Sequence, residues 1–445
     1  MSVRKPEGIS DSNSRVQNQG VRVQGIRGMP DILPLDTPLW WSFDTHWQQL
    51  VESYGYQEVR LPILESTALF KRSIGEVTDI VEKEMFTFQD REGESLTLRP
   101  EGTAGCARLC LEHGLLHNQV QRLWYKGPMF RYERPQKGRY RQFHHVGVEA
   151  FGLFGPDIEV EHILMMKRFW ETTGIAEDVI SLQVNSLGSP ASRQLYRDRL
   201  VNYFSKYSKD LDEDSLRRLN TNPLRILDSK NPALAGIIQE APKSHETLDE
   251  DSKQHFDSFL QRLSDNAVNY AINPTLVRGL DYYNRTVYEW VTDRLGAQGT
   301  VCAGGRYDNL VGQLGGESTP GVGFAMGIER FLLLWKESGV VSETQVDAYL
   351  ISVGEEPEKN ALRIAELIRN AYPEIRLMTH CGGGSFKNQF KKADKSGAKI
   401  AFILGELELT AKTLGIKFLR EERTQQSISM VELSQFLNQY FRGSL

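Results

Sequence analysis

The chain has 445 residues, of which 40% are hydrophobic and 25% charged, values typical of a folded protein with room for a sizeable core. Its net charge of −5 excludes a nucleic-acid binder that acts through bulk positive charge, so such contacts have to come from local basic patches. No apolar run approaches the roughly 20 residues of a membrane span, and the four cysteines form neither a CxxC pair nor a Cys/His cluster, which argues against a membrane protein, a zinc knuckle and a secreted disulfide scaffold.

The N-terminal residues 1–22 are polar, lack the apolar core of a signal peptide, and contain acidic residues that a mitochondrial presequence avoids. We therefore expect a flexible tail and a cytoplasmic protein. Ordered structure is expected to begin with "IRGMPDILPLD". A helix is predicted over 37–55, because Pro38 stands in its first turn and Gly55 follows its end.

Strand patterns then dominate as far as residue 152. The predicted strands are 56–66 with a break at Pro62, 84–90, 96–102, 121–133 and 141–152. A helix is predicted over 102–114. Strands that pair across short loops, with helices between them, favour an α+β domain built on an antiparallel sheet.

The composition changes between about 190 and 273, where charged amphipathic helices replace the strands. Strand patterns return after this segment, so we expect a helical insertion within one domain that spans 23–340. From residue 346 to 445, short apolar strands alternate with helices, the rhythm of a small sheet with parallel strands. Lysines spaced four apart, Lys387 to Lys395, share one helix face there. That face is either simply solvated or in contact with phosphates.

The stretch "LTLRPEGTAG" carries Glu101 and Thr103 from a strand end into a helix. A carboxylate there can bind an ammonium group, and the threonine hydroxyl can accept a hydrogen bond. An ordinary N-capping turn with Thr103 as the cap explains the same pattern. Both interpretations stay open at this point.

The basic stretch "RYERPQKGRYRQFHH" begins at Arg131, directly after a predicted strand. Its guanidinium can bind a phosphate through two hydrogen bonds, and Phe143 can stack on a flat base. A solvated hairpin with a basic tip, or a simple ion pair between Arg131 and Glu133, is the alternative. The adjacent histidines lie on opposite faces of a strand, so they do not form a metal pair.

Two further stretches combine aromatic, glycine and arginine residues. "LVRGLDYYNRTVYEW" contains Arg278 and two adjacent tyrosines, and "GVGFAMGIERFLLL" runs from a glycine-rich strand into a helix with Arg330 near its start. A cationic side chain near a helix N-terminus is unfavourable for the helix dipole, which favours a ligand role for Arg330. Aromatic strands often only fill a core. No G-x-x-x-x-G-K-[ST] sequence occurs, which disfavours a P-loop ATPase.

Taken in order, these stretches resemble the class II aminoacyl-tRNA synthetases, and in particular the bacterial histidyl-tRNA synthetase family, over nearly the whole chain from about Val23. The two peptides "LVRGLDYYNRTVYEW" and "AGGRYDNL" resemble those that distinguish the histidine enzymes. The resemblance implies a homodimer, a six-stranded antiparallel catalytic sheet with a helical insertion, and a C-terminal α/β anticodon-binding domain. It also implies that ATP and L-histidine form histidyl-adenylate, from which the histidine tRNA receives the histidyl group.

The resemblance assigns roles by matching position. Arg131 is expected to hold the α-phosphate of ATP with Arg278 across from it, and these two are the expected catalytic residues. Further ATP contacts are expected from Glu133 at the adenine amino group, Phe143 on the ring, Arg330, and Arg139 nearby. Mg²⁺ is expected to accompany ATP on the side of its terminal phosphates, without a metal site formed by the protein.

The histidine substrate is expected to place its ammonium group at Glu101 and Thr103. The remaining expected histidine contacts are Glu149 and Tyr283 at the imidazole, Tyr282 and Tyr307 lining the pocket, and Arg131, Arg278 and His145. Arg134 and Gln136 are expected to approach the acceptor end of the tRNA. An amino acid of similar shape that lacks the imidazole nitrogens would leave these buried groups without hydrogen-bond partners, so the site would discriminate strongly against it.

One position departs from the family pattern: His145 stands where the family usually has glutamine. A histidine can accept a hydrogen bond from the substrate ammonium only as a neutral imidazole. We therefore expect preserved activity with a steeper loss at acidic pH.

Two other functions remain possible at the level of sequence. A synthetase-like regulatory paralogue would not charge tRNA, and such proteins commonly lose the anticodon domain or catalytic arginines, both of which are present here. A non-enzymatic RNA-binding module would have no need of the two histidine-pocket peptides. Histidine-dependent exchange between ATP and pyrophosphate separates the three.

Overall fold

The structure is a computed structural model that describes residues 23–75, 78, 80–229, 231–296, 299–339 and 346–443. The tail expected over residues 1–22 lies outside this part of the chain. The chain divides into two compact units. The first contains residues up to Ile32 together with Phe43–Gly339, and the second contains Leu33–Ser42 and Val340–Leu445.

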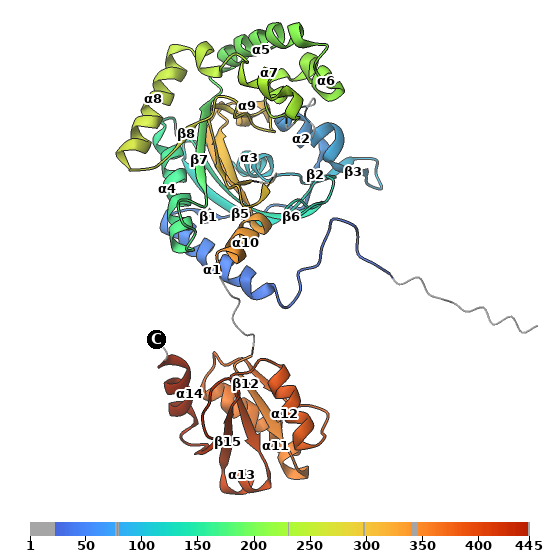
Figure 1. Ribbon diagram of the computed structural model, residues 1–445, viewed down its shortest axis with the longest axis vertical. Coiled ribbons are helices and arrows are strands. Elements are labelled where there is room, and N and C mark those ends of the chain that lie inside the picture. The colour runs from blue at the N-terminus through green and yellow to red at the C-terminus, as the bar shows by residue number, and fades with distance from the viewer. Residues whose placement is uncertain are drawn as a thin grey trace, which may run out of the picture. The chain divides into compact units, whose positions relative to one another are not determined.

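A large sheet forms the centre of the first unit (Figure 1). Its strands are ordered β1-β5-β6-β11-β10-β9-β7-β8. The strand bounds are β1 Gln57–Glu58, β5 Gln121–Phe130, β6 Gln142–Phe151, β7 Ser181–Ser186, β8 Ala271–Ile272, β9 Asn284–Val291, β10 Thr300–Arg306 and β11 Gly321–Gly327. The six strands from β5 to β7 in this order pair antiparallel, which confirms the expected six-stranded sheet, and two-residue strands extend each edge in parallel.

A smaller antiparallel sheet, ordered β2-β4-β3, precedes the first long strand pair. Its strands are β2 Leu64–Ser66, β3 Phe86–Gln89 and β4 Ser95–Leu98. The strands predicted over 84–90 and 96–102 form as β3 and β4, which pair antiparallel. The strand predicted over 56–66 forms as β1 and β2 separated by a gap around Pro62, because proline cannot donate to a ladder.

Helices cover both ends of the first unit. Their bounds are α1 Thr37–Ser53, of which the first unit contains the part from Phe43 on, α2 Thr67–Ile74, α3 Thr103–Glu112, α4 Asp157–Thr172, α5 Pro190–Phe204, α6 Glu213–Thr221, α7 Ala235–Gln239, α8 Glu250–Asp265, α9 Leu310–Gln313 and α10 Ile328–Glu337, with a π-helical turn at Ile80–Glu84. The helical insertion lies between β7 and β8. Figure 1 shows α5, α6 and α7 grouped at one end of the unit, away from α1 and α10.

The second unit contains a five-stranded sheet ordered β13-β12-β14-β15-β16. Its strands are β12 Ala348–Ser352, β13 Leu377–Thr379, β14 Ile400–Leu404, β15 Thr413–Phe418 and β16 Gln426–Ser429, and its helices are α11 Glu355–Ala371, α12 Phe386–Lys395, α13 Glu406–Ala411 and α14 Leu433–Arg442. The first three strands pair in parallel, as the alternating pattern predicted. The antiparallel pair β15–β16 and helix α14 were not predicted.

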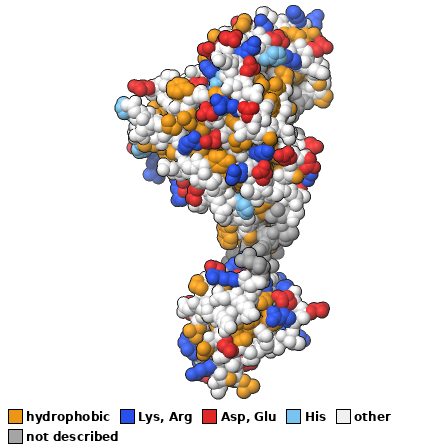
Figure 2. Space-filling view, turned by 90° about the vertical axis from the view of Figure 1, so that its left-hand side faces the viewer, with side chains coloured by type: hydrophobic (Ala, Val, Ile, Leu, Met, Phe, Trp, Pro, Cys, Tyr) orange, Lys and Arg blue, Asp and Glu red, His pale blue; other side chains and the backbone are white. Residues whose placement is uncertain are grey.

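Charges on the surface are mixed in sign. On the face seen in Figure 2, basic and acidic side chains of the first unit lie among one another. Any contact with nucleic acid therefore still has to depend on local basic groups. No helix in the described residues is both long and apolar enough to cross a membrane.

Candidate active site

The stretches singled out in the sequence meet at one cavity of about 160 Å³ in the first unit. Strands β6, β10 and β11, the start of α3, and the segments after β5 and before β9 all contribute to it. Of the predicted site residues, the structure brings to its lining Glu101, Thr103, Arg131, Glu133, Arg139, Phe143, His145, Arg278, Tyr282, Tyr283 and Arg330. Small side chains on the neighbouring strands, among them Ala303 and Ala325, keep this part of the sheet open for a ligand.

Glu101 caps helix α3 from inside the cavity. Its carboxylate accepts the backbone N–H of Thr103 at 2.5 Å and that of Ala104 at 3.0 Å. The capping interpretation is therefore correct in kind, but Glu101 and not Thr103 supplies the cap. Burial raises the pKa of Glu101, against the effect of these two N–H donors. A carboxylate offers about four acceptor positions, so Glu101 can still receive a substrate ammonium group.

Glu149 lies beneath the cavity floor, fully buried on β6. Thr103 donates to its Oε1 at 2.7 Å and Tyr125 donates to the same oxygen at 2.9 Å. The Tyr307 hydroxyl donates to Oε2. Burial raises the pKa of Glu149 to about 8, although the hydroxyls of Tyr307, Thr103 and Tyr125 act in the opposite direction. Glu149 and Tyr307 are not among the residues that line the cavity, whereas Thr103 and Tyr125, which donate hydrogen bonds to Glu149, are.

Three glycines make room for this floor. A Cβ atom at Gly102 or Gly147 would overlap the Tyr125 ring, and one at Gly323 would overlap Oε2 of Glu149. Gly323 pairs with Glu149 in the ladder between β11 and β6, so the carboxylate lies directly over that glycine. Steric overlap thus restricts these three positions to glycine, and the sequence alone does not show this restriction.

Arginine side chains concentrate positive charge on the opposite side of the cavity. Arg131 donates from Nε to the carbonyl oxygen of Pro100 at 2.9 Å, and its guanidinium carbon lies 5.4 Å from the centroid of the Phe143 ring. Burial lowers the pKa of Arg131, and the charge of Arg278 acts in the same direction. Burial together with Arg131 and Arg139 lowers the pKa of Arg330 to about 10. The positive charges of these arginines repel one another, and an anion bound between them would relieve that repulsion.

Arg278 is held by a carboxylate that the sequence analysis did not single out. It forms an ion pair with Glu289 on β9, and Glu289 also accepts the Thr300 hydroxyl at 2.9 Å. Although burial opposes it, Glu289 raises the pKa of Arg278. The Arg278 guanidinium carbon lies 5.6 Å from the centroid of the Tyr283 ring, so Arg278 also contacts a tyrosine of its own peptide.

The simple ion pair considered between Arg131 and Glu133 does not form. Glu133 pairs instead with Arg139, on the other side of the basic loop. The backbones of Arg139 and Gln136 also exchange two hydrogen bonds, with N–O distances of 3.0 and 2.9 Å. The basic loop is therefore folded back on itself and is not a freely solvated hairpin.

The two adjacent histidines have separate environments, as predicted. His145 lines the cavity and packs edge-on against Phe143, with ring centroids 4.9 Å apart. His144 donates its backbone N–H to Glu329 on α10 and approaches the same carboxylate with Nδ1 at 2.8 Å. Burial, Arg131 and Arg330 hold the pKa of His145 well below its usual range. Both effects disfavour the charged imidazole, which argues against the steeper loss at acidic pH that we expected from the sequence.

The two residues expected near the tRNA acceptor end lie outside the cavity. Arg134 and Gln136 are exposed on the basic loop. Gln136 lines a shallow surface hollow together with Pro135 and the segment from Gly25 to Asp31. The carbonyl oxygen of Gly28 accepts the backbone N–H of Arg141 at 2.7 Å, so this N-terminal segment supports the loop.

Tyr125, Glu289 and Glu329 are the residues that sequence reasoning missed or left without a role. Each bonds to a residue outside its own element: Tyr125 to Glu149, Glu289 to Arg278, and Glu329 to His144. For Tyr125 and Glu289 the only signal was the alternation of β5 and β9, which fixes the face that a side chain takes but not the residue that it contacts.

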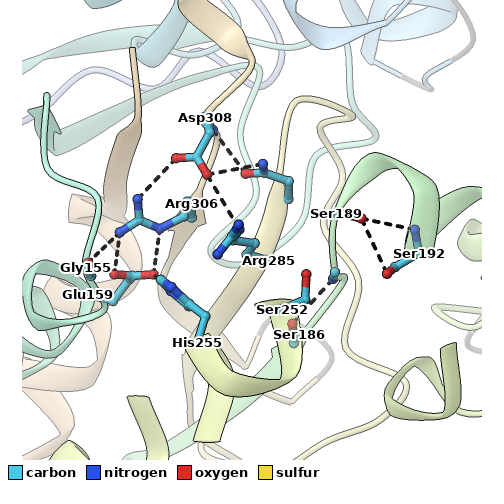
Figure 3. Close-up of polar contacts among 12 residues, drawn as sticks. Gly155, Glu159, Ser186, Ser189, Ser192, Ser252, His255, Arg285, Arg306 and Asp308 are labelled. Carbon is cyan, nitrogen blue, oxygen red and sulfur yellow. Dashed lines mark hydrogen bonds and ion pairs between the residues drawn. The ribbon is translucent and has the colours of Figure 1, made fainter. Parts of the chain in front are cut away.

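A buried ion network lies next to Tyr307. Arg306 donates to both oxygens of Glu159 on α4, at 2.9 and 2.7 Å, and to the backbone carbonyl of Gly155 (Figure 3). It also donates to the backbone carbonyl of Leu153 at 3.0 Å. His255 on α8 contacts the same Glu159 carboxylate at 2.8 Å. Burial opposes ionisation, but Arg306 and His255 lower the pKa of Glu159 to about 2. The insertion helix α8, helix α4 and strand β10 are joined at this point.

Comparison with known proteins gives two family matches. Residues 28–331 match the histidyl-tRNA synthetase family, and residues 347–440 match an anticodon-binding domain. The apo histidyl-tRNA synthetase of S. aureus is 33% identical, with 93% of this chain and 99% of that chain covered and a TM-score of 0.76.

Two more distant solved structures share the fold. A histidyl-tRNA synthetase from Nostoc is 18% identical, covers 94% of this chain and 99% of its own, and has a TM-score of 0.68. A chain described as an ATP phosphoribosyltransferase regulatory subunit/histidyl-tRNA synthetase from Bacillus halodurans is 21% identical, covers 86% and 98%, and has a TM-score of 0.61.

Proposed function

Because the chain belongs to the histidyl-tRNA synthetase family, we propose that it ligates L-histidine to the histidine tRNA through histidyl-adenylate. One observation carries the proposal. The arginines Arg131, Arg278 and Arg330 line the same small cavity as Glu101 and Thr103. A site with clustered cations beside an ammonium-binding carboxylate suits a reaction between a nucleoside triphosphate and an amino acid.

In the first step a carboxylate oxygen of histidine attacks the α-phosphorus of ATP. The bond from that phosphorus to the bridging oxygen breaks, and pyrophosphate leaves with the electron pair. Arg131 and Arg278 neutralise the charge on the α-phosphate, while Arg330, with Arg139 nearby, takes the adenine or the terminal phosphate. Most of the acceleration then comes from positioning and fixed charge. Phe143 and Glu133 take the adenine ring and its amino group.

The imidazole of the substrate reaches the pocket floor between Glu149 and Tyr283. Three hydroxyl donors already occupy Glu149, which leaves about one of its four acceptor positions for an imidazole N–H. His145 remains neutral and can accept a hydrogen bond from the ammonium group that Glu101 and Thr103 also bind. Tyr282 lines the pocket and Tyr307 supports it from below.

In the second step a hydroxyl of the terminal ribose of the tRNA attacks the carbonyl carbon of the adenylate, and AMP leaves. Arg134 and Gln136 contact the acceptor end, since they are exposed beside the cavity on a basic loop. We propose that residues 346–445 form the anticodon-binding domain and residues 23–340 the catalytic domain. The two family matches, which end at 331 and begin at 347, support this division.

We further propose that the enzyme acts as a cytoplasmic homodimer. Exposed apolar side chains at the small sheet support a partner surface: Leu64 on β2 and Phe88 on β3, with Ile63 beside them. Mg²⁺ would enter bound to the phosphates of ATP, where it supplies additional charge neutralisation. The described residues contain no group of three His, Cys, Asp or Glu side chains that could hold a metal ion.

Histidine-dependent ATP–pyrophosphate exchange tests this function, followed by charging of histidine tRNA with labelled histidine. We expect exchange with histidine but not with other amino acids, and transfer to tRNA. Histidine binding without any exchange would contradict the proposal and favour a regulatory paralogue. RNA binding without histidine binding would favour an RNA-binding module.

A further inference from the structure

We propose that Arg193, on the first helix of the insertion, is a positioning residue for the histidine site. It ties together the backbone of the peptide Asp281–Tyr283 and thereby sets the orientation of the two tyrosine rings in the pocket. This inference rests on the proposed function, which makes that peptide part of the histidine site. It gives the insertion a role in amino-acid binding.

The side-chain hydrogen bonds of Arg193 reach one short peptide. Its Nη1 donates to the backbone carbonyl of Asp281 at 2.7 Å and to that of Tyr283 at 3.2 Å. Its Nη2 donates to the carboxylate of Asp281 at 3.0 Å, and Asn222 on the insertion donates to the same oxygen at 3.0 Å. The guanidinium therefore spans Tyr282, the residue between the two carbonyls, on the backbone side.

The peptide needs such support because its backbone is irregular. Arg285 has a φ of +49°, a left-handed conformation that costs energy for a residue with a side chain. The ladder between β9 and β10 shifts register between Gly305 and Arg306, where Asn284 becomes the partner of Arg306. Regular strand bonding thus begins only after the tyrosines. An unusual backbone persists only where its surroundings determine it.

The start of α5 is itself fixed, so Arg193 can act as a rigid support. Ser189 caps the helix by accepting the backbone N–H of Ser192 (Figure 3), and both serine hydroxyls donate to Asp249 at the start of α8. The backbone of Gly188 accepts from Arg285 at 2.9 Å. The insertion and the tyrosine peptide are therefore joined on both sides of Tyr283.

The rings that this peptide carries contact the substrate site directly. Tyr282 and Tyr283 line the cavity with ring centroids 4.7 Å apart, and Tyr282 lies 5.5 Å from the ring of Tyr307 beneath the floor. The phosphate side depends less on this peptide, because Glu289 on β9 holds Arg278 and Pro100 holds Arg131. Loss of Arg193 should therefore act on histidine more than on ATP.

The test compares Arg193→Gln, Arg193→Lys and the control Arg199→Gln by ATP–pyrophosphate exchange, with the Michaelis constants for histidine and ATP measured separately. Arg199 lies on the same helix and forms an exposed ion pair with Glu246 of the insertion. For Arg193→Gln we expect the histidine constant to rise roughly ten- to a hundredfold, as when a supporting contact misplaces a binding group. The ATP constant should stay within about twofold. Arg193→Lys should be intermediate, because an ammonium group can hold one carbonyl but not the full set.

Thermal unfolding and calorimetric histidine binding accompany the kinetics. If Arg193→Gln does not fold, Arg193→Lys decides the question. Equal rises in the histidine and ATP constants, or a histidine constant no different from that of Arg199→Gln, would overturn the inference. A wild-type protein that shows no histidine-dependent exchange would overturn the proposed function instead, so the two failures are distinct.

Discussion

The Thr103 hydroxyl donates a hydrogen bond to Oε1 of Glu149 at 2.7 Å, and this bond joins the first turn of α3 to the floor of the cavity. The residue expected to receive the ammonium group is thus bonded to the residue expected to receive the imidazole. The two ends of the amino acid are read by one connected network, and a change at either residue should affect both. Networks of this kind are costly when only partly satisfied.

Glu149→Gln should change how stability depends on pH. The pKa of Glu149 is raised from 4.5 to about 8 in the folded chain, so the native state holds this proton more tightly than the unfolded state does. Its contribution is full below about pH 4.5 and is lost as pH rises toward 8, with a slope of at most about 1.4 kcal/mol per pH unit. Urea unfolding of both proteins between about pH 5 and pH 8 measures this. Parallel curves for wild type and Glu149→Gln would contradict the shift.

His145→Gln should leave the pH profile of histidine binding unchanged between about pH 6 and pH 8. Burial with Arg131 and Arg330 holds the pKa of His145 well below its usual range, so the imidazole does not charge in this interval. The Michaelis constant for histidine, measured across the interval for both proteins, checks the prediction. A wild-type constant that climbs below pH 7 while that of His145→Gln stays flat would show that His145 titrates there after all.

Arg278→Lys should lower the exchange rate by about a hundredfold or more, the usual effect of losing a preorganised charge contact at a reacting centre. A lysine cannot pair with Glu289 and face a phosphate at the same time, because it lacks the fork of the guanidinium. The measurement is the turnover number of ATP–pyrophosphate exchange at saturating substrates. Arg168→Lys, an exposed arginine of α4 whose guanidinium lies near Tyr54, is the control. A substantially active Arg278→Lys would remove Arg278 from the mechanism.

Gly323→Ala should destabilise the first unit by about 1–3 kcal/mol or more, because its methyl group would overlap Oε2 of Glu149 and push the carboxylate from its hydroxyl donors. Gly312→Ala is the matched control. It lies in α9 with no heavy atom within 4 Å of its added methyl group, and alanine favours a helix. Differential scanning calorimetry of both variants gives the comparison. Equal melting temperatures would mean that the floor can rearrange.

The sequence predicted the central part of the fold where local patterns are strong. The pair β5–β6 and helix α3 follow from alternation and helical spacing, and the resemblance supplied the number of antiparallel strands. The strands β15 and β16 were missed because they have short, mixed apolar and polar patterns whose pairing partner lies across a turn. Local periodicity does not show which segments meet.

The same limit applies to the site. Residues that touch substrate in the proposed mechanism lie in distinctive stretches, so most of those expected in the cavity do line it. The residues that hold them in place do not lie in such stretches. Arg193 reaches a peptide 88 positions away in the chain, and Glu329 reaches His144 from 185 positions away. Neither has a motif of its own. The low pKa of His145 also comes from burial and from two arginines brought close only by folding.

The glycines under the floor bear on how this protein's specificity can change. Tyr125 and Glu149 fill the space that Gly102, Gly147 and Gly323 leave, so no single larger side chain fits there without displacing them. An altered amino-acid preference would therefore require the tyrosine, the carboxylate and their glycine neighbours to change together. Each intermediate would carry an overlap or an unpaired buried group. Stepwise selection on this floor is expected to stall, and libraries that vary both layers at once are the more promising way to redesign it.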